Sequence, residues 1–195
     1  MAPIRPDDGD ERELRSERVV YRRAAPADVE PLRTHWARAE VRRYLWDDEI
    51  VTEEHVRAAV SRGETAERAF GGGLWCMDRG GTFVGTCGLL PVFPELDSLL
   101  TAVVDEELLA RIGDAPLVEV LYSLEPHAWG AGLAREATKA MLRFGHATLG
   151  LPVIFGGTDV PNERSRRTLD GTGMREYARF DGDVGPLVYF VSVAG

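Results

Sequence analysis

The segment from residue 117 to residue 149 constrains the fold most strongly, because a strand pattern passes through a glycine-containing turn directly into a long helix pattern. Residues 117–124 (LVEVLYSL) alternate as a strand with two different faces does. After the turn, residues 132–149 carry an apolar stripe at helical spacing. Gly130 and Gly132 stand at the mouth of this helix, where a backbone without side chains lets an anion approach the free N–H groups of the first turn. The junction therefore indicates either a phosphate-binding site or only a tight strand-to-helix turn.

The rest of the chain changes repeatedly between the two periodicities, which indicates a mixed α/β fold without internal repeats. A short glycine-containing linker between the second and third expected strands predicts a β-hairpin. The expected strands are residues 18–25, 72–78, 82–90, 117–124, 153–160, 175–180 and 187–193. The expected helices are residues 27–39, 52–63, 132–149 and 162–169.

Two segments stand outside this alternation. Residues 92–116 separate the third and fourth expected strands, although hairpin loops usually take roughly 2–5 residues. Their apolar residues keep helical spacing between Ser98, which suits a helix N-cap, and Gly113, which suits a helix end, so we expect an inserted helix. Residues 1–15 mix proline, glycine and charges of both signs. We expect them to form a flexible tail before a single domain over residues 16–195.

The composition argues against several classes of function. The 195 residues carry a formal net charge of −9, which argues against nonspecific nucleic-acid binding and mildly favours a cationic substrate. Cys76 and Cys87 are the only cysteines; they cannot form a disulfide framework or a four-cysteine zinc site, and we expect no metal. No apolar run approaches the roughly 20 residues that span a bilayer, and the first residues are too polar for a signal peptide. These features predict a cytoplasmic protein without a membrane partner.

Two motifs and their spacing resemble the GNAT N-acetyltransferase superfamily. Residues 119–137 read EVLYSLEPHAWGAGLAREA, which is similar to motif A of that superfamily. Residues 162–174 read NERSRRTLDGTGM and match N-x-x-S-x-[RK]-x-L-x-x-x-G-[FM], the pattern of the branch that includes the ribosomal-protein N-terminal acetyltransferases. The opening strand ERVVYR, residues 17–22, is also similar to that branch. The resemblance extends over residues 15–195, and two motifs in order are more specific than either motif alone.

The resemblance implies a single GNAT-like α/β domain with a central mixed, mostly antiparallel sheet flanked by helices. Its fourth and fifth strands, here residues 117–124 and 153–160, would splay apart in a V to seat acetyl-CoA. The implied activity is that of an acyltransferase, which moves the acetyl group to a primary amine by direct attack in a ternary complex. The acceptor stays open between a peptide or protein N-terminal amine and a small cationic amine such as a polyamine or an aminoglycoside. A non-catalytic acyl-CoA-binding sensor or partner module and a homodimeric assembly are further alternatives.

The same resemblance assigns cofactor contacts to both motifs. The backbone of residues 130–134 would hold the pyrophosphate, a backbone N–H at Ser123–Leu124 would polarise the thioester, and Asn162 would bind the pantetheine amides. The sequence departs from the family at His127, where glutamine or arginine is usual, and at Arg135, where a small hydroxyl residue is usual. Asn162 also suits a helix N-cap, which is an alternative reason for its presence. The expected cofactor-binding residues are Ser123, Leu124, His127, Trp129, Gly130, Ala131, Gly132, Leu133, Ala134, Arg135, Asn162 and Ser165.

Glu119 and Ser165 are the expected catalytic residues. Alternation places Glu119 on the strand face that would border the cofactor cleft, where a carboxylate among aliphatic residues needs a polar or cationic partner. Glu119 would accept the proton that the attacking amine must lose, or it would only pair with a nearby arginine. Ser165 would donate a proton or hydrogen bond to the leaving thiolate, or it would only give the helix clearance.

The acceptor side is expected in the segment that follows the first helix. Tyr44, Trp46, Asp47 and Asp48 fall in the region that resembles the acceptor-side helix and loop of the family, and the carboxylates would hold an ammonium group. The alternative is a solvated acidic loop, the ordinary role of such a run. The histidines show no metal-ligand spacing, and we interpret His35 as a surface or cap residue. Because the inserted segment borders this side, the acceptor is not inherited from ribosomal-protein relatives.

Overall fold

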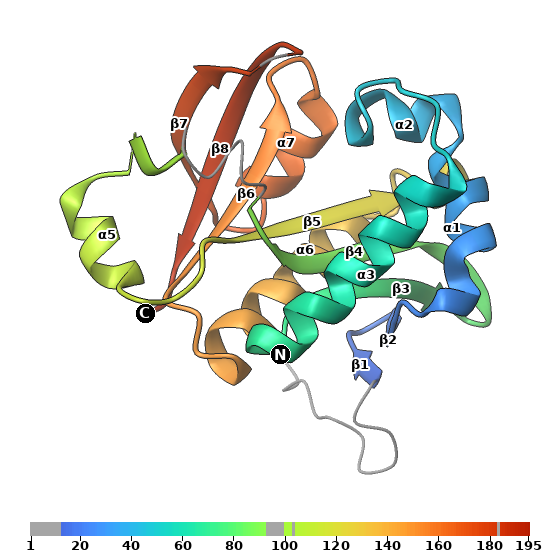
Figure 1. The fold of residues 1–195 in the computed structure, drawn as a ribbon, viewed down its shortest axis with the longest axis horizontal. Coiled ribbons are helices and arrows are strands. Elements are labelled where there is room, and N and C mark those ends of the chain that lie inside the picture. The colour runs from blue at the N-terminus through green and yellow to red at the C-terminus, as the bar shows by residue number, and fades with distance from the viewer. Residues whose placement is uncertain (1–12, 93–99, 103, 183) are drawn as a thin grey trace.

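The computed structural model describes residues 13–92, 100–102, 104–182 and 184–195. Within them the chain forms an eight-stranded sheet in the order β1-β2-β3-β4-β5-β6-β8-β7, with helices on both faces (Figure 1). The strands are β1 (Glu13–Arg15), β2 (Val20–Arg23), β3 (Gly73–Arg79), β4 (Thr82–Pro91), β5 (Val118–Leu124), β6 (Val153–Asp159), β7 (Arg175–Asp181) and β8 (Pro186–Val193). The helices are α1 (Val29–Trp36), α2 (Ala39–Leu45), α3 (Glu53–Phe70), α5 (Glu106–Ile112), α6 (Leu133–Arg143) and α7 (Glu163–Asp170). The expected mixed α/β fold is confirmed.

The sheet is mixed because β5 and β6 run parallel, whereas the other neighbouring strands are antiparallel. β4 and β5 pair in an unbroken register from Gly85 to Pro91 on the β4 side. By contrast, β5 and β6 share a single register position, Glu119 with Phe155, and diverge beyond it (Figure 1). The V expected between the fourth and fifth strands is therefore present between β5 and β6, and it opens toward the C-terminal ends of both strands.

Helices α1, α2 and α3 lie on one side of the N-terminal half of the sheet, and α6 lies on the other side (Figure 1). α3 begins with a capping box between Thr52 and His55 and ends at Gly71, whose φ of 81° is left-handed. It continues past the end expected at Gly63, where the missing side chain lets α3 pack directly on β3. A Cβ at Gly63 would lie only 2.9 Å from that of Leu74. None of the described helices is long and apolar enough to cross a membrane.

Two buried clusters, one on each face, hold these layers on the sheet. The alternation expected for β5 is confirmed, because its even-numbered residues join the cluster under α6 and Leu121 joins the cluster under α3. The cluster under α6 includes Val118, Val120, Leu133, Ala137 and Met141. The cluster under α3 includes Leu32, Trp36, Val56, Val60 and Leu74.

The inserted segment contains α5, which lies against the C-terminal half of the sheet (Figure 1). Asp105 caps this helix by accepting the N–H of Leu108 at 2.8 Å, whereas the cap expected at Ser98 lies outside the described residues. The buried residues Leu100, Val104, Leu108 and Ile112 pack with Val153, Phe155, Tyr189 and Val191. Phe155 packs under α5 and is the register partner of Glu119, whose side chain contacts Arg62 of α3. Helices α3 and α5 therefore cover the same face of the sheet.

The N-terminal boundary of the fold differs from the expected one. Residues Glu13–Arg15 pair with β2 as an edge strand. Residues 13–15 are therefore not part of the flexible tail that was expected over residues 1–15, and residues 1–12 lie outside the described residues. A three-residue strand carries too little alternation to stand out in a sequence that is otherwise polar.

Candidate active site

A cleft of about 980 Å³ occupies the V between β5 and β6. This volume is that of a site for a small molecule or cofactor. Most expected cofactor residues and both expected catalytic residues line it, whereas His127 and Ala131 do not. The lining residues are Glu40, Val41, Tyr44 and Leu45 of α2, residues 119–124 of β5, Ala128, Trp129, Gly130, Gly132, Leu133, Ala134 and Arg135, and Gly157, Thr158, Asn162, Arg164, Ser165, Arg167 and Thr168.

The N-terminus of α6 offers backbone donors to this cleft. Gly132 is the N-cap residue, with a left-handed φ of 77°, and no side chain caps the helix. Gly130 has a φ of 75°, and a Cβ placed there would meet no atom within 4 Å. A larger residue would strain this backbone and project into the open space. The loop therefore fits an anionic group such as a pyrophosphate, which would accept hydrogen bonds from the first-turn N–H groups.

Two arginines brace the first turn of α6. The Arg18 guanidinium donates to the Ala131 carbonyl at 2.9 Å and pairs with Glu136 at 2.7 Å. These contacts tie the start of the domain to the loop before α6. Arg135, exposed on α6, extends to the end of α7, where a Cβ on Gly171 would lie 2.5 Å from its guanidinium. The side chain of Arg135 therefore lies against the C-terminal end of α7, and the residue also lines the cleft.

The N-terminus of α7, on the opposite wall, is capped. The side-chain oxygen of Asn162 accepts the backbone N–H of Ser165 at 3.2 Å, which confirms the N-cap interpretation. The cap uses only the oxygen, so the amide N–H groups of Asn162 remain available to a ligand. The Ser165 hydroxyl lies 2.9 Å from the hydroxyl of Tyr122 on β5. Tyr122 thus connects the two walls of the V.

The backbone of β5 turns alternate N–H groups toward β4 and toward the cleft. The N–H of Glu125 donates to Val84 at 3.0 Å, and Leu117 accepts from Val92 at 2.9 Å. The register between these two bonds is unbroken, so the odd-numbered residues of β5 face β4 and the even-numbered residues face β6. The N–H groups of Tyr122 and Leu124 therefore point into the V. Of the two residues expected to polarise the thioester, only Leu124 turns its N–H into the V, because the N–H of Ser123 faces β4. Leu124 lies five residues, about 16 Å, along the strand from Glu119, whereas Tyr122 is nearer.

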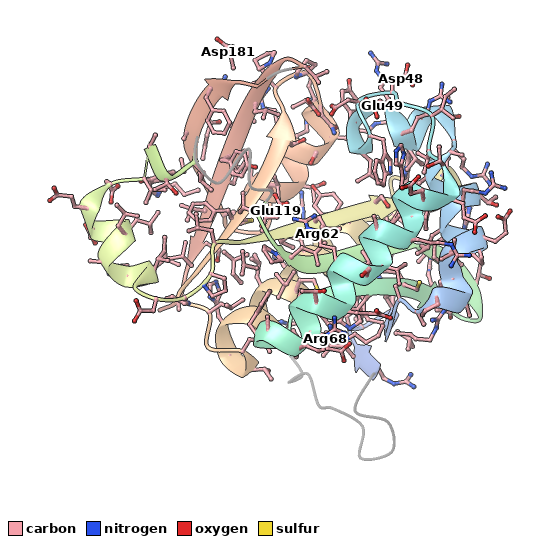
Figure 2. The ribbon with its side chains drawn as sticks, viewed as in Figure 1. Asp48, Glu49, Arg62, Arg68, Glu119 and Asp181 are labelled. Atoms are coloured by element: carbon pink, nitrogen blue, oxygen red, sulfur yellow. The ribbon has the colours of Figure 1, made fainter. Side chains whose placement is uncertain are left out.

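Glu119 lies at the closed end of the V beside Arg62 of α3 (Figure 2). Its carboxylate is 3.6 Å from the Arg62 guanidinium, and only 9% of the residue is exposed. Burial raises the pKa of Glu119 to about 7, although the positive charge of Arg62 opposes this rise. A carboxyl group with a pKa near neutrality suits a general base. The arginine partner expected for Glu119 is thus present, and it does not keep the carboxyl fully ionised.

A buried polar network behind the end of β5 was not expected from the sequence. His35 is fully buried, not at the surface, and its Nε2 lies 2.9 Å from the Ser123 hydroxyl. The same hydroxyl is bonded to Trp36 at 3.2 Å and to Thr86 at 2.8 Å. Burial lowers the pKa of His35 to about 4, despite Glu125 at 3.1 Å, so the imidazole is neutral at pH 7. No periodic pattern could have linked these residues, because they come from three separate elements.

The two aromatic residues expected on the acceptor side have different surroundings. Tyr44 of α2 lines the cleft. Trp46 instead packs between Trp36, with ring centroids 5.6 Å apart, and His55, with ring centroids 5.5 Å apart. Tyr44 is thus positioned to meet a ligand, and Trp46 holds the loop after α2 on α1 and α3.

The two expected aspartates also separate. Asp48 pairs with Arg42 at 2.8 Å, and Figure 2 shows it at the outer edge of the loop after α2, away from Glu119. Asp47 has a left-handed φ of 50°, as Asp48 has with 62°. Burial, and secondarily the charge of Asp47, raise the pKa of Asp159 at the end of β6. Asp47 therefore lies near enough to Asp159 for the two negative charges to repel, and Asp48 is engaged within its own loop; neither aspartate is among the residues that line the cleft.

Residues 18–175 match the protein-family model described as the acetyltransferase (GNAT) domain. Among curated proteins, the chain is 29% identical over 110 residues to FsC-acetyl coenzyme A-N(2)-transacetylase of Aspergillus fumigatus. That match covers 56% of this chain and 42% of the relative, so the chain corresponds to less than half of the relative's length.

Two solved structures illustrate the likeness in fold. RimL, the ribosomal L7/L12 alpha-N-protein acetyltransferase in complex with coenzyme A, superposes with a TM-score of 0.70 at 12% identity, covering 92% of this chain and 96% of its own. AAC(6′)-Ib in complex with ribostamycin and coenzyme A superposes with a TM-score of 0.69 at 14% identity, covering 91% and 94%. At these identities the likeness shows the shared fold alone.

Proposed function

Because this chain belongs to the GNAT acetyltransferase family, we propose that it acetylates a primary amine in the cleft between β5 and β6, with acetyl-CoA as donor. One observation carries the proposal. A single cleft joins the uncapped N-terminus of α6 to the buried carboxyl of Glu119. The first feature suits the phosphates of the donor, and the second suits the proton of the acceptor.

Acetyl-CoA, the acetyl donor, would be held mainly by backbone groups. N–H groups of residues 130–134 would bind the pyrophosphate, and the free amide N–H groups of Asn162 would bind the pantetheine arm. The N–H groups of Tyr122 and Leu124 both point into the V. That of Tyr122, the nearer to Glu119, would polarise the thioester carbonyl as charge develops on its oxygen. That of Leu124, about 16 Å along the strand from Glu119, would bind the pantetheine arm. The helix and the sheet fix these backbone N–H groups before acetyl-CoA binds, which makes them effective in stabilising a transition state.

The acceptor nitrogen must lose a proton when it attacks the thioester carbon. A lysine-type amine has a pKa of about 10.4 and an α-amine one of about 8. Glu119 would accept that proton, and Arg62 would limit how far burial raises the pKa of its carboxyl. As the carbon–sulfur bond breaks, the hydroxyl of Ser165 would donate a hydrogen bond to the leaving thiolate. Tyr122 supports Ser165 in this position from β5.

The acceptor is proposed to be a slender cationic amine, either small or the start of an extended peptide. Glu119 is 9% exposed at the closed end of the V, so a reacting amine must extend from a narrow stem. Glu40 and Tyr44 of α2 line the cleft, and the carboxylate of Glu40 would attract a cationic amine. Relatives with the same fold carry either kind of acceptor in their names, a ribosomal protein for RimL and an aminoglycoside for AAC(6′)-Ib.

The direct test is release of free CoA, followed by thiol detection, with acetyl-CoA and a panel of N-terminal peptides, polyamines, aminoglycosides and amino acids. We expect one class of amine to stimulate release and the Glu119→Gln variant to lose that stimulation. A matched control is Glu176→Gln, which changes a surface carboxylate paired with Arg179. Tight acetyl-CoA binding without release in any amine would support the alternative of a binding module.

A further inference from the structure

Trp129 and Arg164 meet across the cleft, although no pattern in the sequence links them. Cζ of Arg164, in the first turn of α7, lies 4.8 Å from the centroid of the Trp129 ring. Trp129 belongs to the loop that leads into α6, and both residues line the cleft. The contact therefore joins the two walls beside the uncapped N–H groups of α6.

The indole is anchored at its other edge. Its Nε1 donates to the carbonyl of Leu124 at 2.9 Å, and the ring packs against the clusters on both faces of the sheet. A cation over such a ring is attracted by its π electrons. The anchored ring thus holds the Arg164 guanidinium beside the α6 loop, because Trp129 directly precedes Gly130.

The guanidinium of Arg164 keeps its hydrogen-bond donors free. Among the described residues, neither a carboxylate nor a hydrogen-bond acceptor meets it. By contrast, Arg167 of the same helix pairs with Glu163 at 2.6 Å, and Arg135 extends away to Gly171. An arginine that contacts an aromatic face still presents its N–H groups in its own plane, where they can bind two phosphate oxygens at once.

We propose that Arg164, held over Trp129, binds the pyrophosphate of acyl-CoA from the α7 wall, opposite the N–H groups of the α6 loop. This inference rests on the proposed function, because it takes acyl-CoA as the ligand. It supplies a positive charge from the α7 side of the cleft, where the α6 loop offers backbone N–H groups and His127 lies outside the lining. The two walls then hold one ligand by different means, backbone donors on one side and a charged side chain on the other.

Equilibrium binding of CoA, dephospho-CoA and pantetheine, measured by calorimetry, tests the proposal. The Arg164→Met variant should bind CoA and dephospho-CoA roughly 10-fold to 100-fold more weakly, the usual effect of losing hydrogen bonds to a charged group. Its affinity for pantetheine, which has no pyrophosphate, should stay unchanged. Arg164→Lys should lose less, because a lysine keeps the charge but not the planar fork. Arg167→Met is the matched control, since Arg167 lines the same wall but is already paired.

Each outcome separates the inference from the proposed function. Absence of CoA binding by the unmodified protein would contradict the proposed function itself. If the unmodified protein binds CoA and Arg164→Met binds it equally well, only the role of Arg164 is wrong. Equal weakening for CoA and pantetheine would show a structural effect, and weakening for CoA but not dephospho-CoA would move the contact to the 3′-phosphate; both results overturn the assignment to the pyrophosphate.

Discussion

The side of the cleft that would bind acetyl-CoA, here called the donor wall, and the side that would bind the amine, here called the acceptor wall, are built on different principles. The donor wall is formed largely by backbone N–H groups of one continuous segment, from β5 through Gly130 and Gly132 into α6. The acceptor wall is formed by side chains from separate elements, among them Glu119 of β5 and Tyr44 of α2, and Arg62 of α3 pairs with Glu119. The donor wall therefore depends on conformation and tolerates little at its glycines, whereas the acceptor wall depends on chemical identity. Substitutions on the donor wall should therefore lower CoA affinity, whereas substitutions on the acceptor wall should change the rate and its pH dependence.

The largest effect is expected from Gly130→Glu on the donor wall. The new side chain would strain a backbone with a φ of 75° and bring a carboxylate to the anion loop. We expect CoA affinity to fall by more than about 100-fold, measured by calorimetry, because repulsion adds to the lost backbone contacts. Gly150→Glu is the matched control, since Gly150 has a φ of 68° and open space around it but does not line the cleft. Binding retained by Gly130→Glu would remove the phosphate assignment of the loop.

The next largest effect is expected from Glu119→Gln on the acceptor wall. A base works only when ionised, so with a pKa of about 7 the kcat/KM of the unmodified protein should rise as the pH passes through neutrality. The variant should lose this rise and about 100-fold in kcat, while its CoA affinity stays unchanged. The measurements are kcat/KM across pH, at acceptor concentrations below KM with saturating acetyl-CoA, and kcat at a saturating acceptor concentration. A loss that is the same at every pH would instead assign Glu119 to binding or structure.

Arg62→Met should shift the same profile without abolishing activity. The Arg62 charge lowers the pKa of Glu119, so its removal should raise that pKa and move the rise in kcat/KM upward by about one pH unit. The kcat/KM at pH 7 should fall about fivefold, because the ionised fraction of Glu119 falls by that factor, and it should recover at alkaline pH. Arg62→Lys keeps a charge at this position and serves as the control. An unshifted profile would contradict the electrostatic link between the two residues.

The smallest effect is expected from Asn162, which caps α7 and would also bind the pantetheine arm. Asn162→Ala should destabilise the fold by about 1 kcal/mol through the lost cap of α7. This corresponds to a Tm lower by roughly 2–4 °C, and CoA affinity should fall several-fold as well. Asn162→Ser keeps an oxygen for the cap but has no amide N–H groups. It should restore the Tm without restoring the affinity; recovery of both would leave Asn162 with a capping role only.

The donor wall could be predicted from the sequence because its information is local. The strand pattern, Gly130, Gly132 and the helix stripe are neighbours in the chain, and their conformations follow from propensity and periodicity. The alternation of β5 also placed Glu119 on the cleft face. The resemblance to a known family then supplied the expectation that these pieces bind acetyl-CoA.

The rest depended on which elements become neighbours, and no single-chain pattern contains that information. His35 was misjudged because a histidine on a helix gives no sign that Ser123 will pack against it. The choice of Leu124 over Ser123 as the inward N–H donor required the register between β4 and β5. The sequence also did not indicate that Trp46 packs between Trp36 and His55 or that Asp48 pairs with Arg42. Packing, not periodicity, decides such roles.

The single register position between β5 and β6 has a thermodynamic consequence for the whole chain. Beyond it, the facing edges of the two strands lack each other as hydrogen-bond partners, so the halves of the sheet are joined there mainly by side chains. A donor molecule with amides along its pantetheine arm would fill the place of the missing ladder. Its binding free energy would then add to the folding free energy, and melting temperature would rise with the logarithm of donor concentration. Amide hydrogens where the two strands diverge would exchange more slowly as acetyl-CoA accumulates, so their protection from hydrogen exchange would increase with its concentration.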